Sequence, residues 1–385
     1  MNVETLAVLS QVSEYIACVA NSDEVWSKKV FSLYPNFQRK YLSLWKFDSY
    51  KQIYVTILRH YGSLPGLWYV PKDNGLGKYG GLFLGKYDET GLKCFEIVPS
   101  PSGSFSLQTF FSILYDFVDE KVLIICHKCK SPANCHFKNG SFVFSCKSFH
   151  CPEESSTMDF LSYTKDYLQL EHSLIAERHM QGVLDMRYKR LILNFQSCEM
   201  QRYYYVDDSY NELAEIKTGL YTGDFNWNGF ELVACSVNDK KLVLTKVTGN
   251  SNMPAGSIIV TTDLRKRLWI QQFNQEDLIF LQSTCTQHNL EESEYYHKPE
   301  HIGRRQEVVL PFRTQQTIDV PTTCEYRLVG ETFFAGHMNA FPSSEPCHVF
   351  IFDADTIGVL SLGLSLTFVM LSRFQHKLSA LLSSL

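Results

Sequence analysis

Hydrophobic side chains recur at every third or fourth position in three stretches of the chain, which is the spacing of one face of a helix. The first stretch covers residues 5–34, and Asn21-Ser22-Asp23 supplies a break and a cap inside it. The second covers residues 50–61 and stops at Gly62, and the third covers residues 153–193. The sequence therefore predicts helices in these three stretches.

Short apolar runs separated by glycine and other turn residues fill residues 65–126 and resume after Leu191. Runs of this length and spacing are typical of antiparallel sheets that close into a barrel or stack as a sandwich. Aromatic residues make up 14% of the chain, and their rings pack well on the pleated surface of a sheet. We therefore expect an α+β fold that is mainly β, with an antiparallel barrel-like domain, one long helix and a short helical N-terminal segment.

The uncharged stretch from Thr356 to Leu371 approaches the length of a membrane helix. From Leu360 to Phe368, however, apolar residues occupy every second position, with small or polar residues between them. This period of two is typical of a strand with one buried face. We expect a strand here and no transmembrane span.

The charge balance does not favour a nucleic-acid or membrane partner. Formal net charge is −5, from 36 Lys and Arg against 41 Asp and Glu, whereas surfaces that bind phosphate backbones or anionic lipids are strongly basic. The polar residues 274–306 show no clear period, and we expect a surface insertion there.

Motifs of catalysis are absent from the sequence, which contains no G-x-S-x-G, no P-loop and no H-E-x-x-H. Asp353 and Asp355 stand at alternate positions after a strand, an arrangement that most often marks a solvated turn. We therefore expect a protein that is not an enzyme.

Whether the twelve cysteines form disulfides or bind metal depends on whether the compartment is oxidising or reducing. The N-terminus lacks the basic start and uninterrupted apolar stretch of a signal peptide, so we expect the reducing cytoplasm and nucleus. There, clustered thiols bind metal more often than they form disulfides. Five of the cysteines crowd into residues 126–151, and the seven others are expected to pack as small apolar residues.

Two short-spaced cysteine pairs in this cluster match the needs of tetrahedral zinc. Cys126 and Cys129 form C-x2-C, and after sixteen residues Cys146 and Cys151 form C-x4-C around a hairpin-like insert. Four thiolates leave no open coordination position, so we expect a structural Zn2+. Three alternative ligands stay open, because spacing alone does not decide among them: Cys135, His136 and His150.

Several segments, in order along the chain, resemble one known family. VSEYIACVANSDEVWSKKV is similar to the latter half of an F-box. The segments YKQIYVTILRHYGSLPGLWYV, KYGGLF, LTKVTGNSNMPAGSIIVTTDLRKRL, EVVLPF, AGHMNAFPSS and VFIFDADTIGVLSLGLSLTF resemble the F-box only protein 31 family. The match in T-K-V-T-G-N-S-N-M-P-A-G is the most specific.

The resemblance implies a substrate receptor of an SCF-type cullin–RING ubiquitin ligase. In such a receptor the F-box docks on a Skp-type adaptor, and the β-rich remainder captures a protein substrate, for which the tails of D-type cyclins are the known kind. The family also has a zinc site of Cys and His ligands, which supports metal at the cysteine cluster. The candidate adaptor-binding residues are Leu6, Leu9, Val12 and Trp26.

Two departures from the family pattern affect these expectations. An F-box contains about three packed helices, and the L-P-x-E-x-L start of the box is missing here, so we expect a truncated box with part of its apolar face exposed. Asn250 stands where the family usually has Asp, and a carboxamide forms hydrogen bonds but no charged pair.

The TGNSNMPAG segment forms a tight polar turn between two strands. Its residues either build only a hairpin connection, or present a cation and amides at a barrel mouth to the terminal carboxyl or amide group of a peptide. His337 belongs to the A-G-H element; by residue type alone it indicates a hydrogen-bonded structural histidine. The candidate substrate-binding residues are Lys246, Thr248, Asn250, Asn252 and His337.

We thus expect residues 1–45 to form a partial F-box and residues 46–385 a β-rich substrate-binding domain that includes the zinc knuckle at 126–151. The expected function is recognition of a cyclin-like tail for ubiquitination and proteasomal degradation. Two alternatives stay open: a stand-alone peptide-binding protein that has lost the adaptor contact, and a small-molecule enzyme built in the barrel mouth.

Overall fold

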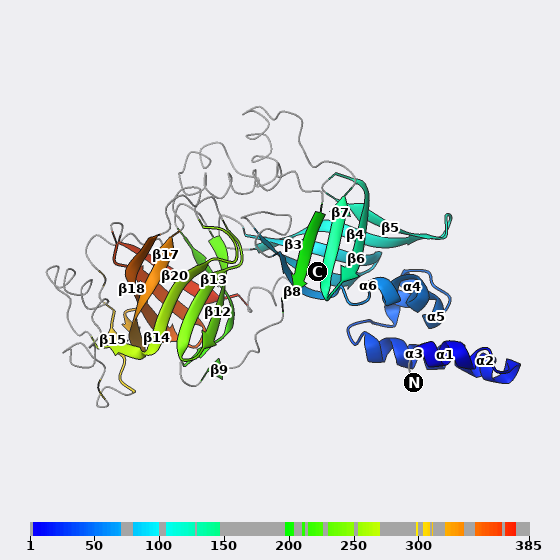
Figure 1. Ribbon diagram of the computed structural model, residues 1–385, viewed down its shortest axis with the longest axis horizontal. Helices are drawn as coiled ribbons and strands as arrows, with labels where there is room; N and C mark the ends of the chain where they lie inside the picture. The colour runs from blue at the N-terminus through cyan, green and yellow to red at the C-terminus, as the bar shows by residue number, and fades with distance from the viewer. Residues whose placement is uncertain are drawn as a thin grey trace, which may run out of the picture.

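The computed structural model describes an N-terminal group of helices and two β-barrels (Figure 1). The predicted helix at 153–193 and most of the predicted insertion at 274–306 lie outside the described residues. Every helix among the residues that the structure describes is too short or too polar to span a membrane. The described residues are 3–70, 80–99, 105–127, 129–146, 197–203, 210–211, 215–225, 230–249, 253–269, 298, 303–308, 310, 320–334, 343–363 and 366–374.

Short helices fill the N-terminal part of the described chain, as the three- and four-residue spacing predicted. Ser13 caps the second helix, because its hydroxyl accepts a hydrogen bond from the Ile16 N–H at 3.3 Å. Trp26 is buried, and its ring centroid lies 5.3 Å from that of Tyr54. The segments are α1 (Val3–Leu9), α2 (Glu14–Ala20), α3 (Asp23–Leu33), α4 (Lys40–Leu44), α5 (Tyr50–Ile53), the π-helical η1 (Tyr54–Leu58) and α6 (Arg59–Tyr61).

Eight antiparallel strands close the first barrel in simple chain order. The barrel closes where Trp68 of β1 pairs with Arg202 of β8. Its core is aromatic: the Phe111 ring stacks on those of Phe142 and Phe144, with centroids 5.5 and 4.8 Å apart. The strands are β1 (Gly66–Val70), β2 (Gly81–Asp88), β3 (Gly91–Pro99), β4 (Phe105–Asp116), β5 (Lys121–Cys126), β6 (Ser131–Lys138), β7 (Ser141–Cys146) and β8 (Ser197–Arg202).

The helices pack on this first barrel. Trp45 Nε1 donates to the Asp88 carbonyl oxygen at 2.8 Å, and the Tyr87 hydroxyl donates to the Gly62 carbonyl oxygen at 2.9 Å. The buried residues of the helices and of the barrel interior form one hydrophobic cluster. The helices therefore extend the core of the first barrel, on the side away from the second barrel (Figure 1).

A second closed barrel follows, and β11 pairs with both β12 and β20 to complete it. Two small two-stranded sheets accompany it, β9 (Tyr210–Asn211) with β10 (Ile216–Lys217) and β15 (Gln306–Glu307) with β16 (Thr323–Cys324). The barrel strands are β11 (Gly219–Asp224), β12 (Phe230–Asn238), β13 (Lys241–Lys246), β14 (Ile258–Leu268), β17 (Tyr326–Phe334), β18 (Ser343–Asp353), β19 (Thr356–Ser361) and β20 (Thr367–Arg373).

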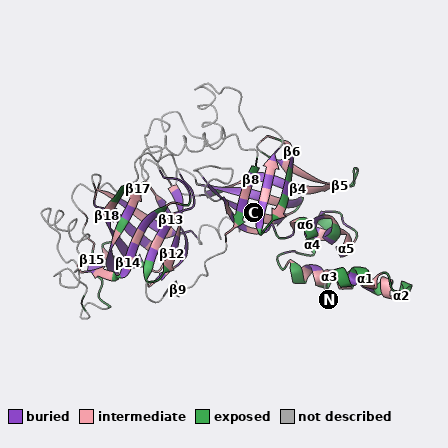
Figure 2. Ribbon diagram, viewed as in Figure 1, coloured by how far each residue is buried: buried purple, intermediate pink, exposed green. Residues whose placement is uncertain are grey.

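The two barrels meet along an apolar junction, and Figure 2 shows that buried residues concentrate in both of them. Phe105 of the first barrel packs edge-on against Phe374, which follows the last strand of the second, with centroids 4.7 Å apart. The junction cluster comprises Leu67, Leu82, Leu84, Ile97 and Phe105 with Leu220, Leu232, Val247 and Phe374.

The mainly β, antiparallel and barrel-like fold expected from the sequence is confirmed, whereas its division into two barrels was not predicted. The prediction of one strand from Leu360 to Phe368 was wrong in detail. The chain leaves β19 after Ser361 and returns as β20 from Thr367, paired with β19. The alternation of apolar and small residues continues through the turn, so the sequence period does not mark the reversal.

Candidate functional site

Three cysteines converge at one end of the first barrel. Cys126 ends β5, Cys129 lies in the turn that follows, and Cys146 ends β7, which runs in the same direction as β5. Their Sγ atoms all lie within 4.8 Å of one another, and those of Cys129 and Cys146 are 3.1 Å apart. Cys126 and Cys146 are buried and Cys129 is half-buried. This cluster can hold a metal ion.

Three thiolates suit a thiophilic metal that prefers four ligands in a tetrahedron. They would supply three of those four ligands. Burial raises the pKa of the Cys129 thiol, but hydrogen bonds involving Cys146 and Ser131 together outweigh it and bring the pKa below its ordinary value. A lowered pKa favours the thiolate, which is the form that binds metal.

Cys135 and His136, two of the alternative ligands, do not join the three cysteines. Both lie on β6, where Cys135 is buried in the core and His136 is exposed on the opposite face. Burial raises the pKa of the Cys135 thiol, which disfavours its thiolate. The predicted ligand Cys151 and its alternative His150 lie outside the described residues, so the fourth ligand stays a prediction.

Lys246 and Thr248, expected at a barrel mouth, are instead buried at 4% and 0% exposure. The Lys246 ammonium forms an ion pair with the buried Glu231 carboxylate and lies 5.1 Å from the centroid of the Phe225 ring. Burial lowers the pKa of Lys246, and the Glu231 carboxylate acts against that shift. Thr248 Oγ1 accepts a hydrogen bond from the Leu232 N–H at 2.9 Å. Both side chains therefore hold the start of the turn in place.

The central residues of the predicted substrate turn, Asn250 and Asn252, lie outside the described residues, as does His337. Their substrate-binding role stays a prediction. The described parts of the turn lie on both sides of them: Val247 to Gly249, and Met253 onward, with Met253 and Ala255 buried.

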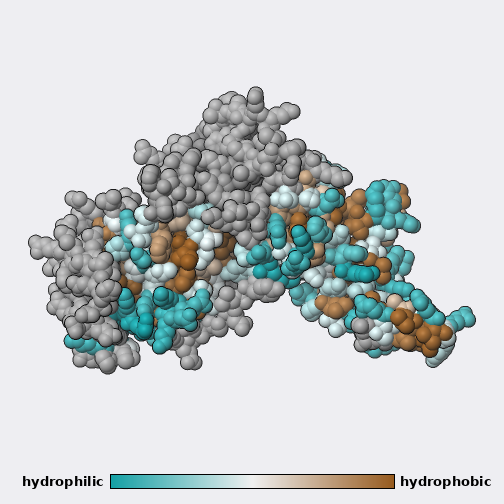
Figure 3. Space-filling view, viewed as in Figure 1, coloured by the Kyte–Doolittle hydropathy of each residue, from teal (hydrophilic) through white to brown (hydrophobic). Residues whose placement is uncertain are grey.

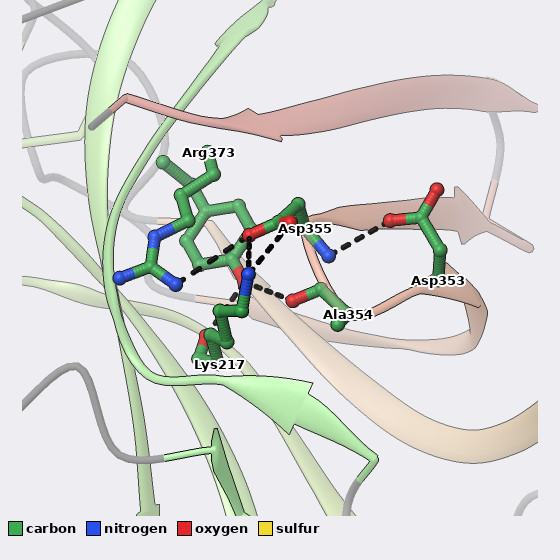
Figure 4. A network of polar contacts seen from close by, with 6 residues as sticks. Lys217, Asp353, Ala354, Asp355 and Arg373 are labelled. Carbon is green, nitrogen blue, oxygen red and sulfur yellow. Dashed lines mark hydrogen bonds and ion pairs between the residues drawn. The ribbon is translucent and has the colours of Figure 1, made fainter. Parts of the chain in front are cut away.

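The F-D-A-D segment forms a network of polar contacts in the second barrel (Figure 4). Lys217 Nζ donates to Asp355 Oδ1 and Oδ2 at 3.2 and 3.0 Å, and Arg373 Nη1 donates to Oδ1 at 3.4 Å. Burial raises the pKa of the Asp355 carboxyl, but Lys217 and Arg373 together hold it below its ordinary value. Asp353 Oδ1 accepts from the Asp355 N–H at 2.8 Å. Through these hydrogen bonds and ion pairs the motif connects β10, the β18–β19 turn and β20. Its role is therefore structural.

The predicted adaptor-binding residues divide between the core and the surface of the helices. Leu6 and Trp26 are buried, and Trp26 Nε1 donates to the Ala20 carbonyl oxygen at 3.0 Å. Leu9 is half-buried, whereas Val12 is 60% exposed. Figure 3 shows apolar surface gathered at this end of the molecule. We call four residues the apolar row: Val8, Val12, Tyr15 and Val19, exposed by 63%, 60%, 80% and 49%.

Two buried basic residues in the second barrel were not predicted. Arg327 of β17 and His348 of β18 are both 0% exposed. No hydrogen-bond partner for their side-chain nitrogens exists in the part of the chain that the structure describes. The Arg327 guanidinium lies 4.3 Å from the centroid of the Phe350 ring, and burial lowers its pKa to about 10. Burial, with the Arg327 charge, lowers the pKa of His348 well below its ordinary value.

A cavity of about 360 Å³ opens on the second barrel between β13, β14, β17 and β18. Residues of both charge signs line it, including Lys241, Lys266 and Glu331. Asp263, also in the lining, is bound by Arg265, whose side-chain nitrogens donate to its carboxylate at 2.9 and 2.6 Å. The cavity lies at the end of β13 opposite to Lys246 and the substrate turn.

Comparisons with known proteins agree with this architecture. Residues 202–377, which include the whole second barrel, match the family model described as the Cyclin D1 binding domain. F-box only protein 31 of Mus musculus and that of Rattus norvegicus are each 23% identical over 422 residues, covering 96% of this chain and 81% of the relative. The Homo sapiens protein is 22% identical, over 96% of this chain and 79% of its own length. The chain is therefore a homologue of F-box only protein 31 along nearly its whole length, with a Cyclin D1 binding domain match over its second barrel.

Proposed function

We propose that this protein is a non-catalytic substrate-recognition subunit of an SCF-type E3 ubiquitin ligase. The observation that carries the proposal is the family match at residues 202–377, because it covers a complete barrel and the description names a cyclin as the bound protein. Relatives named as F-box proteins, aligned along nearly the whole chain, support the adaptor-binding part. The receptor acts in the cytoplasm and nucleus, where its thiols stay reduced.

The substrate in this proposal is the C-terminal tail of a D-type cyclin. Asn250 and Asn252 contact the end of the tail with their carboxamides, which donate and accept hydrogen bonds, and His337 adds a third polar group. Lys246 and Thr248 act indirectly, because their side chains are buried and engage Glu231 and the Leu232 N–H.

The adaptor contact in this proposal is made by the apolar row, in which Val8 belongs to α1, Val12 to the turn that follows, and Tyr15 and Val19 to α2. Several exposed apolar groups within one short segment are typical of a docking surface. Val12 and Tyr15 are the two central members, whereas Leu6 and Trp26 support the helices from inside. The Skp-type adaptor then connects the receptor to the cullin–RING core.

Zinc is the metal proposed for the cysteine cluster, held by Cys126, Cys129, Cys146 and Cys151, with His150 as the alternative fourth ligand. Bound zinc supplies a cross-link and no reactive position, because four protein ligands fill its shell. Cys126 and Cys146 belong to β5 and β7, which both pair with β6, so the cross-link fixes three neighbouring strands. The site braces the barrel.

Co-purification with a recombinant Skp-type adaptor tests the ligase proposal. The wild-type chain should form a stable complex at micromolar concentration, and Val12→Asp together with Tyr15→Asp should abolish it by placing charges in the apolar row. Val118→Asp is the matched control, since Val118 is 91% exposed but lies in the β4–β5 turn of the first barrel. A wild-type chain that elutes as a monomer in the presence of the adaptor contradicts the proposal.

One observation favours a second candidate, a stand-alone peptide-binding protein. Leu6 and Trp26 are used in the chain's own core, which leaves fewer apolar groups for an adaptor. This candidate predicts that the chain binds the cyclin tail and does not bind the adaptor, so the same co-purification separates the two.

A further inference from the structure

The substrate turn is in contact with both barrels. Gly80, the residue before β2 of the first barrel, forms an antiparallel bridge with Thr248 of the turn. Residues far apart in the sequence thus pair through their backbones at the point where the second barrel presents the turn. The contact is local, because this bridge lies outside the named strands of either barrel.

The approach of the two backbones at this bridge leaves no room for a side chain. Gly80 has a φ of +57°, a left-handed conformation that favours glycine. A Cβ atom at Gly80 would lie 2.4 Å from the Ala255 Cβ and 2.9 Å from the Val247 carbonyl oxygen. Val247 and Ala255 lie on opposite sides of the predicted substrate contacts, so Gly80 touches both arms of the turn.

The second barrel holds the same two arms from its own side. The N–H groups of Val247 and Thr248 both donate to the Leu232 carbonyl oxygen, at 2.9 and 3.3 Å. The Gly256 N–H donates to the Lys246 carbonyl oxygen at 2.8 Å, which closes the base of the turn. The arms are therefore fixed between β12 of the second barrel and Gly80 of the first.

An apolar cluster keeps the first barrel in position for this contact. Val247 belongs to the junction cluster together with Leu82 of β2, two residues after Gly80. Phe105 and Phe374 close the cluster with their edge-on ring contact. Burial of these side chains gives the junction a non-directional attraction, whereas the bridge at Gly80 fixes the register.

We propose that the peptide site is composite: the first barrel, through Gly80, positions the turn of the second barrel for substrate. This inference rests on the proposed peptide-binding function. Gly80 is a positioning residue, because it touches the arms of the turn and not the substrate. Preorganisation of a binding turn raises affinity by removing the cost of ordering it on binding.

The test is a set of substitutions in the full-length, metal-loaded chain, titrated with a cyclin D1 C-terminal tail peptide. Gly80→Ala should weaken binding by about tenfold or more, because a displaced turn is competent in only a fraction of molecules. Ala255→Gly removes the methyl group that makes the shortest contact with the new Cβ but leaves the contact with the Val247 carbonyl oxygen, so the double variant Gly80→Ala, Ala255→Gly should recover part of the lost affinity. Metal content should stay at the wild-type level in every variant.

Gly140→Ala is the matched control for backbone strain. Gly140 has a φ of +82° in the β6–β7 hairpin, and a Cβ there would meet nothing within 4 Å. This variant carries the strain of a left-handed alanine without a collision, and it should bind the peptide as the wild type does. Loss of binding in Gly140→Ala equal to that in Gly80→Ala would overturn the inference.

Amide hydrogen exchange supplies a readout that needs no peptide. Gly80→Ala should speed exchange at the N–H groups of Val247, Thr248 and Gly256, and the double variant should slow it again. If Gly80→Ala does not fold, Phe105→Leu weakens the same junction without backbone strain and should change exchange in the same direction. Unchanged exchange and unchanged peptide affinity in the folded variants overturn the composite site. A wild-type chain that binds no peptide refutes the proposed function instead, while exchange still decides the positioning role.

Discussion

The two barrels share a strand number and an antiparallel order but differ in what they bury. The first barrel fills its core with stacked phenylalanines and has Glu96 as its only buried charged residue among those the structure describes. In the second barrel the core is largely aliphatic, and several ionisable side chains are buried: Glu231, Lys246, Arg327, His348 and Arg373.

This difference indicates a division of labour. Aromatic stacking stabilises a barrel without placing charges in its interior. Buried charges cost free energy unless each is paired, so they are retained mainly where they define a geometry or a function. The first barrel therefore suits a scaffold, and the second, which carries the Cyclin D1 binding domain match, suits recognition.

Removal of a cysteine proposed to bind zinc should have the largest effect on the first barrel. Cys146→Ser should abolish binding of about one zinc per chain and lower the free energy of unfolding by about 5 kcal/mol or more, since structural zinc is bound with a large folding free energy. Metal analysis and chemical unfolding measure the two effects. Cys135→Ala is the control, because Cys135 is buried outside the cluster, and it should keep the metal. Retention of zinc by Cys146→Ser would show that Cys146 does not bind the metal.

Breaking the buried ion pair should have the next largest effect, this time in the second barrel. Glu231→Gln leaves the Lys246 ammonium buried without its carboxylate, which should cost about 3–5 kcal/mol of unfolding free energy. Glu24→Gln is the matched control, because the pair of Glu24 with Lys28 is 77% and 75% exposed, and it should leave the unfolding midpoint unchanged. Equal midpoints for both variants would show that the buried pair is not structural.

Replacing Arg327 should raise stability. The guanidinium is buried, its nitrogens have no hydrogen-bond partner in the described part of the chain, and the Phe350 ring compensates only in part. Arg327→Met keeps the apolar volume and removes the charge, so the free energy of unfolding should increase by about 1–2 kcal/mol. A decrease measured by chemical unfolding would contradict the view that the second barrel carries an uncompensated charge.

The pH dependence of stability should reflect the buried His348 of the second barrel. The pKa of His348 in the folded chain lies well below its ordinary value, because of burial and the Arg327 charge. The unfolded chain therefore takes up a proton that the folded barrel excludes. The stability contribution is fully present above pH ~6.5 and decreases by about 1.4 kcal/mol per pH unit as the pH falls below that value. His348→Val should remove this part of the slope in unfolding measured from pH 7 to 5; an unchanged slope would contradict the assignment.

Local patterns predicted the elements well. The helical spacing at residues 5–34 and 50–61 predicted helices and the short apolar runs predicted strands, and the structure confirms these elements where it describes them. The two barrels were not predicted, because closure depends on pairs distant in sequence, such as Trp68 with Arg202. No short-range pattern separates strands of one barrel from those of the other.

The candidate sites show the same limit. The C-x2-C spacing places Cys126 and Cys129 on one turn, and the pairing of β5 and β7 with β6 brings Cys146 next to them, as the two-pair pattern predicted. The sequence predicts Lys246 to be a cation at a barrel mouth; this is wrong, and its buried partner Glu231 lies on a neighbouring strand, where the local sequence does not reveal the pair. In the sequence Arg327 is a basic residue among apolar neighbours. Its burial could not be predicted from them and becomes apparent only in the sheet.

The central claim, that the second barrel receives a peptide through the turn after β13, is tested most directly by calorimetric titration of a cyclin D1 C-terminal tail peptide into the metal-loaded full chain. We expect saturable binding of one peptide per chain, lost in the variant that combines Asn250→Ala with Asn252→Ala and retained in Glu24→Gln. Binding that is absent from the wild type, or equal in the wild type and the double variant, would contradict it.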